Sequence, residues 1–238
     1  MIMEPVIGHR GVAALAPENT LSSIRKAAEQ GVKWIELDVT LLGDGSAVMF
    51  HDARINRTTS GTGHLRNTDI EMLRQLDAGS WFGSEFAGEK VPTLKEALEL
   101  IKELNLSLNL ELKPNRCNLK QLAVTVTETL AETKFPEENL LVSSFNHKAL
   151  VLFRNRSSVR VSCLYESLPL NWRHKAKQVN ASAIHLNGGR VTGKKAANVK
   201  AEGYELYCYT VNDSQQAKRL KALGVNGVFS DNPALIRG

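Results

Sequence analysis

Residues 33–42 read KWIELDVTLL. Side chains on a β-strand point alternately to its two faces, so this run places Ile35 and Leu37 on one face and Glu36 and Asp38 on the other. Such a strand is aliphatic on one side and acidic on the other. If the aliphatic side packs on helices, the two carboxylates point into the interior of the sheet.

A second stretch repeats this pattern later in the chain. Residues 107–113 read SLNLELK, with three leucines on one face and with Asn109, Glu111 and Lys113 on the other. Strands of a parallel sheet are covered on both faces, so they are expected to be apolar throughout. The polar residues on these two strands therefore indicate a functional surface.

Strand-like and helix-like segments alternate along nearly the whole chain. Strand-like runs that precede a helical stretch lie near residues 7, 36, 109, 142, 162, 184, 207 and 228. Eight such units in 238 residues predict an α/β fold, namely a (β/α)8 TIM barrel formed by one domain spanning residues 1–238. An open doubly wound sheet is the alternative, but no Gly-x-Gly-x-x-Gly follows the first strand.

One segment, residues 52–92, breaks the alternation. It follows a predicted hairpin, in which the turn Gly43-Asp44-Gly45 joins the second strand to residues 46–50. The segment is rich in Thr, Gly, Arg and Asp and contains the aromatic pair Trp81-Phe82. We interpret it as a small insertion after the second strand and hairpin, outside the repeating core.

Three carboxylates are candidate metal ligands. The active site of a TIM barrel lies at the carboxyl ends of its strands, where Glu36, Asp38 and Glu111 would converge. Carboxylates gathered in a partly buried place repel one another and lose hydration, so they need a cation. Oxygen ligands favour Mg²⁺ or Ca²⁺ over zinc. The alternative is a structural salt-bridge cluster with Arg10 and Lys113, which would leave one of the three acids without a base.

His9 and His51 are the candidate acid–base pair. Each ends a strand beside the predicted metal site, and imidazole titrates near neutral pH. Either residue alone would more often be a core or loop histidine with satisfied hydrogen bonds. Arg10 offers a fork of donors for phosphate oxygens, and Lys113 offers a point charge. His185 has two interpretations, as a substrate contact or as a pore-facing residue bonded to Asn187 or to a backbone carbonyl.

The overall charge is mildly basic. The formal net charge is +5 and the pI is about 9.1. Such a field favours an anion that bears phosphate, although a solvated surface of mixed charge explains most of these residues. No cluster of Lys and Arg is interleaved with aromatic residues, so we expect no nucleic-acid partner.

The compartment is predicted to be the cytoplasm. Met1 to Pro5 contain no positively charged region followed by an apolar stretch, so we expect no secretory signal. No window approaches the roughly 18 apolar residues of a membrane span, and we expect no stable membrane association. Cys117, Cys163 and Cys208 are widely spaced and odd in number, which predicts neither a disulfide framework nor a zinc site.

Many short motifs in this chain together resemble the glycerophosphodiester phosphodiesterase family, above all its cytosolic bacterial members. In chain order they are Gly8-His9-Arg10-Gly11, Pro17-Glu18-Asn19-Thr20, Glu36-Leu37-Asp38, His51-Asp52, Arg57-Thr58-Thr59-Ser60-Gly61-Thr62-Gly63, Leu76-Asp77-Ala78-Gly79-Ser80-Trp81-Phe82, Val91-Pro92-Thr93-Leu94, Glu111-Leu112-Lys113-Pro114, Ser143-Ser144-Phe145 and Tyr209-Thr210-Val211-Asn212. The resemblance covers nearly the whole chain. One departure is Tyr209, where many relatives have Trp.

The resemblance implies hydrolysis of glycerophosphodiesters to sn-glycerol 3-phosphate and an alcohol. It implies a divalent cation on Glu36, Asp38 and Glu111, with His9 and His51 as the acid–base pair. Arg10 and Lys113 would bind the phosphate, and residues 52–92 would cap the mouth and help to hold the glycerol.

The mechanism that we favour makes His9 the base and His51 the acid, although a sequence alone does not orient the pair. It also leaves open whether the glycerol 2-hydroxyl attacks first and gives a cyclic phosphate.

Two other functions compete with this interpretation. A phospholipase on the same barrel would cleave a lipid, and here only Trp81-Phe82 would serve as an apolar membrane contact. A barrel without catalysis would bind phosphorylated ligands as a sensor or scaffold, but it would not need two histidines beside three acids. The alcohol of the substrate, the resident metal and the oligomeric state are not predicted.

Overall fold

The computed structural model describes residue 3 and residues 5–237. Eight strands lie side by side in parallel and close into a ring, because β1 pairs with both β2 and β9. These strands are β1 (Val6–Gly8), β2 (Trp34–Leu41), β4 (Ser107–Leu112), β5 (Leu140–Ser144), β6 (Arg160–Tyr165), β7 (Ala183–Asn187), β8 (Glu205–Tyr209) and β9 (Gly227–Ser230). The predicted TIM barrel is confirmed. Residues 1, 2 and 4, which carried part of the prediction about a leader, lie outside the described residues.

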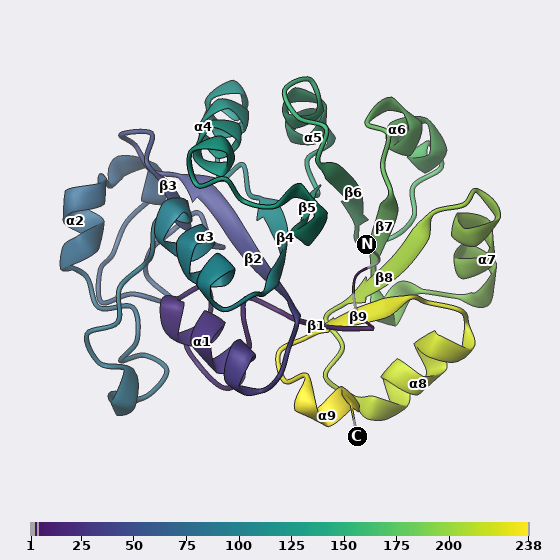
Figure 1. Cartoon of the computed structure of the whole chain (residues 1–238), viewed down its shortest axis with the longest axis horizontal. Coiled ribbons are helices and arrows are strands. Elements are labelled where there is room, and N and C mark those ends of the chain that lie inside the picture. Colours follow the sequence, from purple (N-terminus) through teal and green to yellow (C-terminus); the bar gives the residue numbers. More distant parts are fainter. Residues whose placement is uncertain (1–2, 4, 238) are drawn as a thin grey trace.

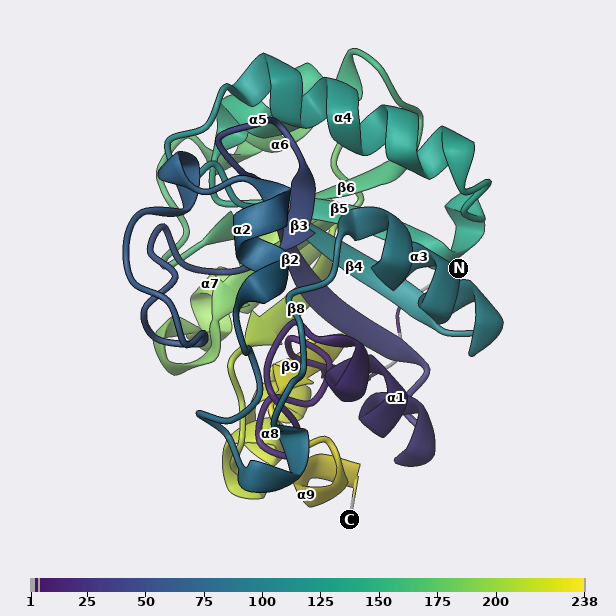
Figure 2. The same cartoon turned by 90° about the vertical axis from the view of Figure 1, so that its left-hand side faces the viewer.

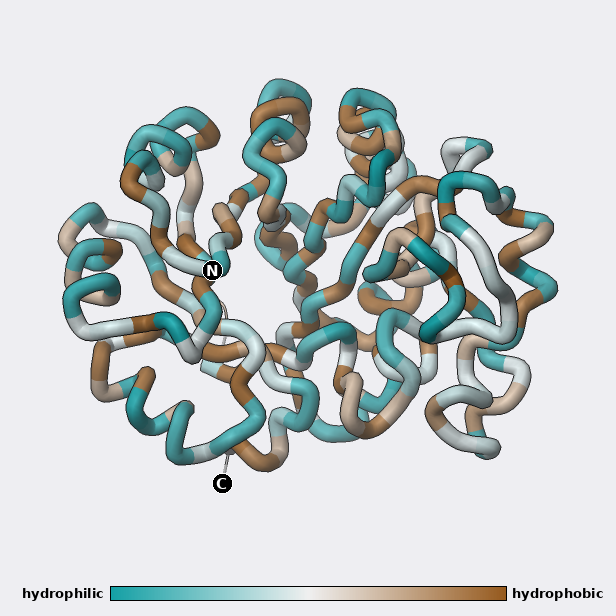
Figure 3. The backbone as a smooth tube through the Cα atoms, turned by 180° about the vertical axis from the view of Figure 1, so that it is seen from behind, coloured by the Kyte–Doolittle hydropathy of each residue, from teal (hydrophilic) through white to brown (hydrophobic). Residues whose placement is uncertain are grey.

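Helices surround the barrel and follow its strands in turn (Figure 1). They are α1 (Leu21–Glu29), α3 (Leu94–Glu103), α4 (Leu119–Glu132), α5 (His147–Arg154), α6 (Trp172–Gln178), α7 (Gly193–Ala201), α8 (Ser214–Ala222) and the short α9 (Ala234–Arg237). Capping boxes at Thr20 and Thr93 begin α1 and α3, because each threonine oxygen accepts a backbone N–H that the first helical turn leaves unpaired. Several helices show hydrophilic and hydrophobic segments in turn (Figure 3), as expected of helices with one buried face.

The two faces of β2 divide as the sequence predicts. Ile35, Leu37 and Val39 are fully buried and pack in the main core between strands and helices. Each aliphatic side chain buried in this way stabilises the fold by about 1.5–3 kcal/mol. The opposite face turns Glu36 and Asp38 into the barrel, above a smaller apolar cluster that fills its lower part and includes Met3, Ile7, Trp34, Leu141, Tyr207 and Phe229.

The insertion forms a small lobe at the side of the barrel (at the left of Figure 1), and this lobe faces the viewer in Figure 2. The predicted hairpin is present, since β3 (Ala47–Met49) runs antiparallel to β2. The segment that follows contains α2 (Ile70–Gln75) and two 3-10 turns, Leu65–Asn67 and Ser84–Phe86. These pack on a second apolar cluster made of Leu42, Val48, Phe50, Ile55, Leu65, Leu73, Ala78 and Val91. That the lobe and the barrel together form one domain stays a prediction.

Two further 3-10 turns, Glu137–Asn139 and Gly188–Arg190, lie in loops of the barrel. Among the residues that the structure describes, no helix combines the length and the apolar character required to cross a bilayer.

Candidate active site

Three carboxylates meet inside the barrel mouth. Glu36 and Asp38 extend from β2, Glu111 extends from the neighbouring β4, and the strand register places Asp38 opposite Glu111. One ligand oxygen from each residue lies within 4.8 Å of the other two. The exposed fractions of the three residues are 4%, 1% and 7%, so water screens their mutual repulsion poorly. The structure therefore brings the three predicted metal ligands together.

Glu36 is the carboxylate with the least compensation. Burial, followed by repulsion from Asp38 and Glu111, raises its pKa well above the usual value. It accepts the backbone N–H of Arg10 at 2.9 Å, but its Oε1 is buried with no hydrogen-bond partner among the described residues. A buried carboxylate oxygen in this state needs either a proton or a cation.

Asp38 and Glu111 have basic partners. Lys113 Nζ lies 3.0 Å from Glu111 and 3.7 Å from Asp38, and Arg10 Nε lies 3.5 Å from Asp38. Burial raises the pKa of Glu111 to about 7, with repulsion from Asp38 adding to it and Lys113 opposing it. Burial also acts to raise the pKa of Asp38, but Lys113, His51 and Arg10 outweigh it and lower that pKa. Salt bridges thus pair two of the three acids, Asp38 and Glu111, with lysine or arginine side chains and leave Glu36, among the described residues, without such a pair. This surplus carboxylate fits a site for a divalent cation, whose preferred ligands are oxygens.

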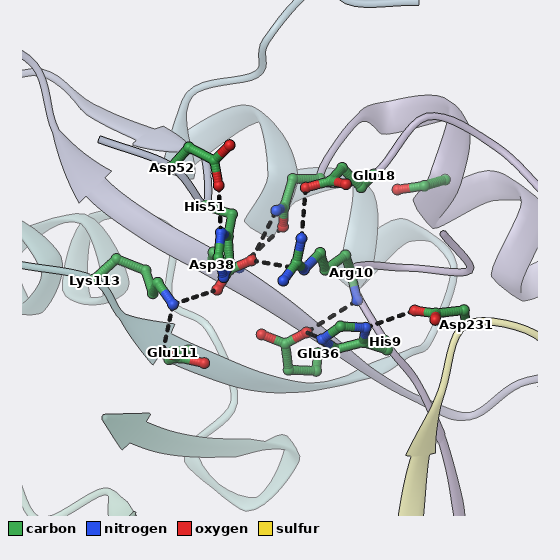
Figure 4. Close-up of polar contacts among 12 residues, drawn as sticks. His9, Arg10, Glu18, Glu36, Asp38, His51, Asp52, Glu111, Lys113 and Asp231 are labelled. Carbon is green, nitrogen blue, oxygen red and sulfur yellow. Dashed lines mark hydrogen bonds and ion pairs between the residues drawn. The ribbon is translucent and has the colours of Figure 1, made fainter. Parts of the chain in front are cut away.

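Each histidine is oriented by an aspartate. His9 Nδ1 lies 2.6 Å from Asp231, and His51 Nδ1 lies 2.6 Å from Asp52 (Figure 4). A carboxylate only accepts, so Nδ1 carries the proton in both pairs and leaves Nε2 free for reacting groups. Nε2 of His9 lies 3.9 Å from Glu36, beside the carboxylate triad. Two similar histidine–aspartate pairs therefore stand next to one acidic cluster.

A tight turn after β1 brings Arg10 into the mouth. Its φ is 50° and that of Gly11 is 85°, both in the left-handed region. A Cβ on Gly8 would lie 2.1 Å from the carbonyl oxygen of Gly11, so only glycine fits there. The backbone N–H of Arg10 donates to Glu36 at 2.9 Å, and its carbonyl accepts the N–H of Asn19 at 3.1 Å. These bonds offset the strain of about 1 kcal/mol or more at Arg10.

Asn19 connects this turn to β2. Its Nδ2 donates to Asp38 Oδ2 at 2.9 Å, and the backbone N–H of Asp38 donates to Asn19 Oδ1 at 3.0 Å. Thr20 follows as the N-cap of α1. The motif Pro17-Glu18-Asn19-Thr20 thus fixes one carboxylate of the triad and the start of a helix together.

Arg57 joins the insertion to the barrel. It donates to Glu18 at 2.7 Å and to Asp52 at 2.7 Å. Glu18 in turn accepts Arg10 Nη1 at 2.8 Å, and Asp52 orients His51. Although burial raises the pKa of Glu18, Arg57 and Arg10 lower it below its usual value, so this carboxylate stays ionised between two guanidinium groups.

A cavity of about 330 Å³ occupies the mouth. One side is lined by His9, Arg10, Glu36, His51, Glu111 and Lys113. On the other side, the rings of Phe145 and Tyr209 meet edge to face at 5.6 Å between centroids. Asn187 donates to Glu166 at 3.1 Å there, and Lys113 Nζ lies 5.8 Å from the centre of the Phe145 ring. The cavity thus has one charged side and one side that mixes aromatic and polar groups.

His185 lies at the floor of this cavity and fits neither prediction completely. It is fully buried and packs on the rings of Phe229 and Tyr207, at 4.9 Å and 5.6 Å between centroids. Within the described part of the chain, neither ring nitrogen has a hydrogen-bond partner, so the expected bond to Asn187 or to a carbonyl is absent. Burial lowers its pKa to about 3, and the ring is neutral at physiological pH.

Sequence reasoning assigned no role to four residues that shape the site, namely Glu18, Asn19, Arg57 and Asp231. All four lie in motifs or at strand ends that the sequence displays, so their positions were the only signal that could have identified them. Their partners lie 222, 39, 19, 8 or 5 positions away in the chain, and spacing does not predict such pairs.

Comparisons with known proteins agree with this geometry. The model of the glycerophosphoryl diester phosphodiesterase family matches residues 9–235. A glycerophosphodiester phosphodiesterase of Caldanaerobacter subterraneus is 33% identical over 96% of this chain and 94% of that protein. One of Bacillus altitudinis is 32% identical over 97% and 96%.

Solved structures show the same similarity. A phosphodiesterase of Oleispira antarctica, solved in complex with the product sn-glycerol-3-phosphate, has a TM-score of 0.95 and 38% identity, over 99% of this chain and 96% of that chain. A glycerophosphodiester phosphodiesterase of Agrobacterium tumefaciens has a TM-score of 0.82 and 26% identity, over 98% and 99%. This chain therefore belongs to the glycerophosphoryl diester phosphodiesterase family and is an enzyme of that family.

Proposed function

We propose that this enzyme hydrolyses glycerophosphodiesters to sn-glycerol 3-phosphate and an alcohol, using His9 and His51 as an acid–base pair and Mg²⁺ or Ca²⁺ as cofactor. The observation that carries the proposal is a cavity lined by two aspartate-oriented histidines and by Glu36 and Glu111, which form a buried carboxylate triad with Asp38. The product bound by the Oleispira antarctica relative supports the choice of substrate.

Glu36, Asp38 and Glu111 would hold the cation. Their donor atoms are all oxygens, which suits a hard ion, and Glu36 lacks other compensation. When bound, the cation would polarise a phosphoryl oxygen or bind a hydroxyl of the substrate. The protein itself supplies Arg10 and Lys113, whose charges border the same cavity and would stabilise the charge that grows on the phosphoryl oxygens.

The environment of His51 favours it as the base, which leaves the role of acid to His9, the reverse of our assignment from sequence. Burial, with Lys113 and Arg10 adding to it, lowers the pKa of His51 in spite of Asp38. A neutral imidazole accepts the proton of the attacking hydroxyl or water as the new P–O bond forms. His9, held by Asp231 on the far side of the ring, would donate a proton to the alcohol oxygen as the old P–O bond breaks.

The mixed side of the cavity suits the glycerol. Phe145 and Tyr209 offer an apolar surface for the carbon chain, while Asn187 and Glu166 offer polar groups for hydroxyls. The substrate is thus a small molecule, and we propose no nucleic-acid partner and no stable membrane association. Three free cysteines, two of them buried, are typical of a reducing compartment and support a cytoplasmic location.

The decisive test measures release of sn-glycerol 3-phosphate from glycerophosphocholine, glycerophosphoethanolamine, glycerophosphoinositol and glycerophosphoglycerol, after chelation and after return of Mg²⁺ or Ca²⁺. We expect turnover that chelation abolishes and one of the two ions restores. Activity that survives exhaustive chelation, or full activity in a His9→Ala/His51→Ala double variant, would refute the assignment. A liposome-binding assay separates this function from that of a lipid-cleaving enzyme, for which retention on vesicles is expected.

A further inference from the structure

A second groove adjoins the catalytic cavity. It measures about 490 Å³ and shares His9 and Arg10 with that cavity, so the two hollows lie on either side of the same pair of residues. Its other walls come from the loop after β1, from Trp81 of the insertion and from the C-terminal segment that holds Leu235. The proposed reaction assigns no role to this groove.

The orientation of His9 connects the two hollows. Its Nε2 lies 3.9 Å from Glu36, which lines the catalytic cavity, and its Nδ1 bonds at 2.6 Å to Asp231, which lines the groove (Figure 4). A phosphodiester carries two alcohol arms on one phosphorus. If the glycerol arm occupies the catalytic cavity, an arm that extends past His9 and Arg10 enters the groove.

The groove walls are partly apolar and exposed. Trp81 is 41% exposed and Leu235 is 57% exposed, although both are large hydrophobic residues. The indole is anchored, because Trp81 Nε1 donates to the carbonyl of Ala78 at 2.9 Å and its ring packs edge to face on Phe82. A fixed, exposed indole is the aromatic surface that binds organic cations most strongly.

Polar groups in the groove also favour a cation. Glu18 and Asp231 line it beside Arg10, so two carboxylates face one guanidinium group there. Arg57 and Arg10 bond Glu18, and His9 and Asn212 bond Asp231, which lowers the pKa of both carboxyls although burial acts to raise it. Asn232 lines it as well, and its Oδ1 is buried without a hydrogen-bond partner in the described part of the chain. An unpaired amide oxygen of this kind needs a donor, which an ammonium N–H supplies.

We propose that this second groove binds the alcohol arm of the substrate and selects alcohols that carry an ammonium group. The inference rests on the proposed function for the identity of the substrate, but the groove is testable without turnover.

Binding alone provides the first test. The chain has three tryptophans, and Trp34 and Trp172 are only 2% exposed, so a ligand in the groove should alter chiefly the fluorescence of Trp81. We expect ethanolamine to change the emission at millimolar concentration and glycerol to leave it unchanged. A Trp81→Phe variant should lose this response. An equal response to ethanolamine and glycerol would overturn the proposal, whether or not the enzyme hydrolyses any glycerophosphodiester.

Turnover provides the second test, through the ratio of kcat/KM for glycerophosphoethanolamine to that for glycerophosphoglycerol. Trp81→Ala should lower this ratio about 3- to 30-fold, the range of cation–π contacts, and Trp81→Phe should restore part of it. Leu235→Lys should lower the ratio and Leu235→Glu should raise it, because only the sign of the added charge differs. Opposite shifts of this kind do not arise from a general loss of folding.

Matched controls lie outside the groove. Leu170 is fully exposed, so Leu170→Lys and Leu170→Glu add the same charges elsewhere and should leave the ratio unchanged. Met72→Ala removes an exposed apolar side chain from the same insertion. A ratio that stays within about twofold of the parent in all Trp81 and Leu235 variants would overturn the proposal. Absence of turnover on every diester, with the fluorescence response intact, would refute the proposed function but would still support ligand binding in the groove.

Discussion

The two halves of the barrel mouth differ in chemistry. The half formed by β9, β1, β2 with its hairpin partner β3, and β4 carries both histidine–aspartate pairs, the carboxylate triad and two basic residues (Figure 4). The half formed by β5 to β8 carries Phe145, Asn187 and Tyr209, with Glu166 as its one carboxylate among the lining residues that the structure describes. In the proposed mechanism, bond breaking and substrate recognition fall to separate strands, so substitutions in the two halves should have different kinetic signatures.

The largest effect is expected from Glu36→Gln in the charged half. Loss of one negative ligand should weaken cation binding and lower kcat/KM by about 10³-fold or more. Titration calorimetry with Mg²⁺ and Ca²⁺ measures the binding directly. Glu166→Gln makes the same chemical change in the other half and should cost about tenfold or less. Similar losses in the two variants would remove the distinction between the halves.

The next effect is the loss of either histidine. His51→Ala and His9→Ala should each lower kcat by about 10²- to 10⁴-fold on a glycerophosphodiester. A substrate with a nitrophenolate leaving group separates the roles, because that group departs without a proton. On it, His9→Ala should regain most of the lost rate and His51→Ala should not. If His51→Ala regains the rate instead, His51 is the acid and His9 is the base.

The charged half should also make stability depend on pH when chelator is present. Glu111, whose pKa is raised to about 7, and Glu36, whose pKa is raised well above its usual value, bind protons in the folded state more tightly than in the unfolded state. The unfolded chain therefore releases these protons at a lower pH than the folded chain does. As a result, the free energy of unfolding falls as pH rises from the ordinary carboxyl range through about 7. Glu111 alone would contribute up to about 3 kcal/mol.

Urea unfolding at pH 5, 6, 7 and 8 measures this effect. A bound cation should abolish the fall, because it takes the place of the protons. Stability of the chelated protein that rises steadily over this interval would contradict the assignment of raised pKa values to the triad.

The smallest effect is expected in the aromatic and polar half. Phe145→Leu removes the ring that packs on Tyr209 and faces Lys113, and should raise KM about 3- to 10-fold with kcat within about twofold. Met72→Ala, an exposed apolar residue remote from the cavity lining, is the control for loss of apolar surface. A fall in kcat larger than the rise in KM would place Phe145 with the catalytic groups.

Much of this architecture follows from period and order in the sequence. The alternation of residues 33–42 correctly divides Ile35 and Leu37 from Glu36 and Asp38, because side-chain direction on a strand is fixed by the backbone. The barrel follows from eight repeated units, since a closed ring leaves no unpaired edge. Both inferences depend on neighbours in the chain.

Contacts between distant segments were beyond the sequence. Asp231 lies 222 positions from His9, and nothing in the order of residues pairs them. The surroundings of His185 are a second example, because the rings of Tyr207 and Phe229 pack on it although both residues are distant from it in the sequence. The second groove combines residues from three separate segments and has no linear signature.

The contacts of Arg57 determine how well the protein tolerates a substitution at this position. Its one guanidinium group bonds Glu18, which holds Arg10, and Asp52, which orients His51. A single replacement at this position would therefore remove two supports at once, that of Arg10 through Glu18 and that of His51 through Asp52. Lysine, with one nitrogen, cannot repair both. Through this position the insertion and the barrel mouth depend on one another.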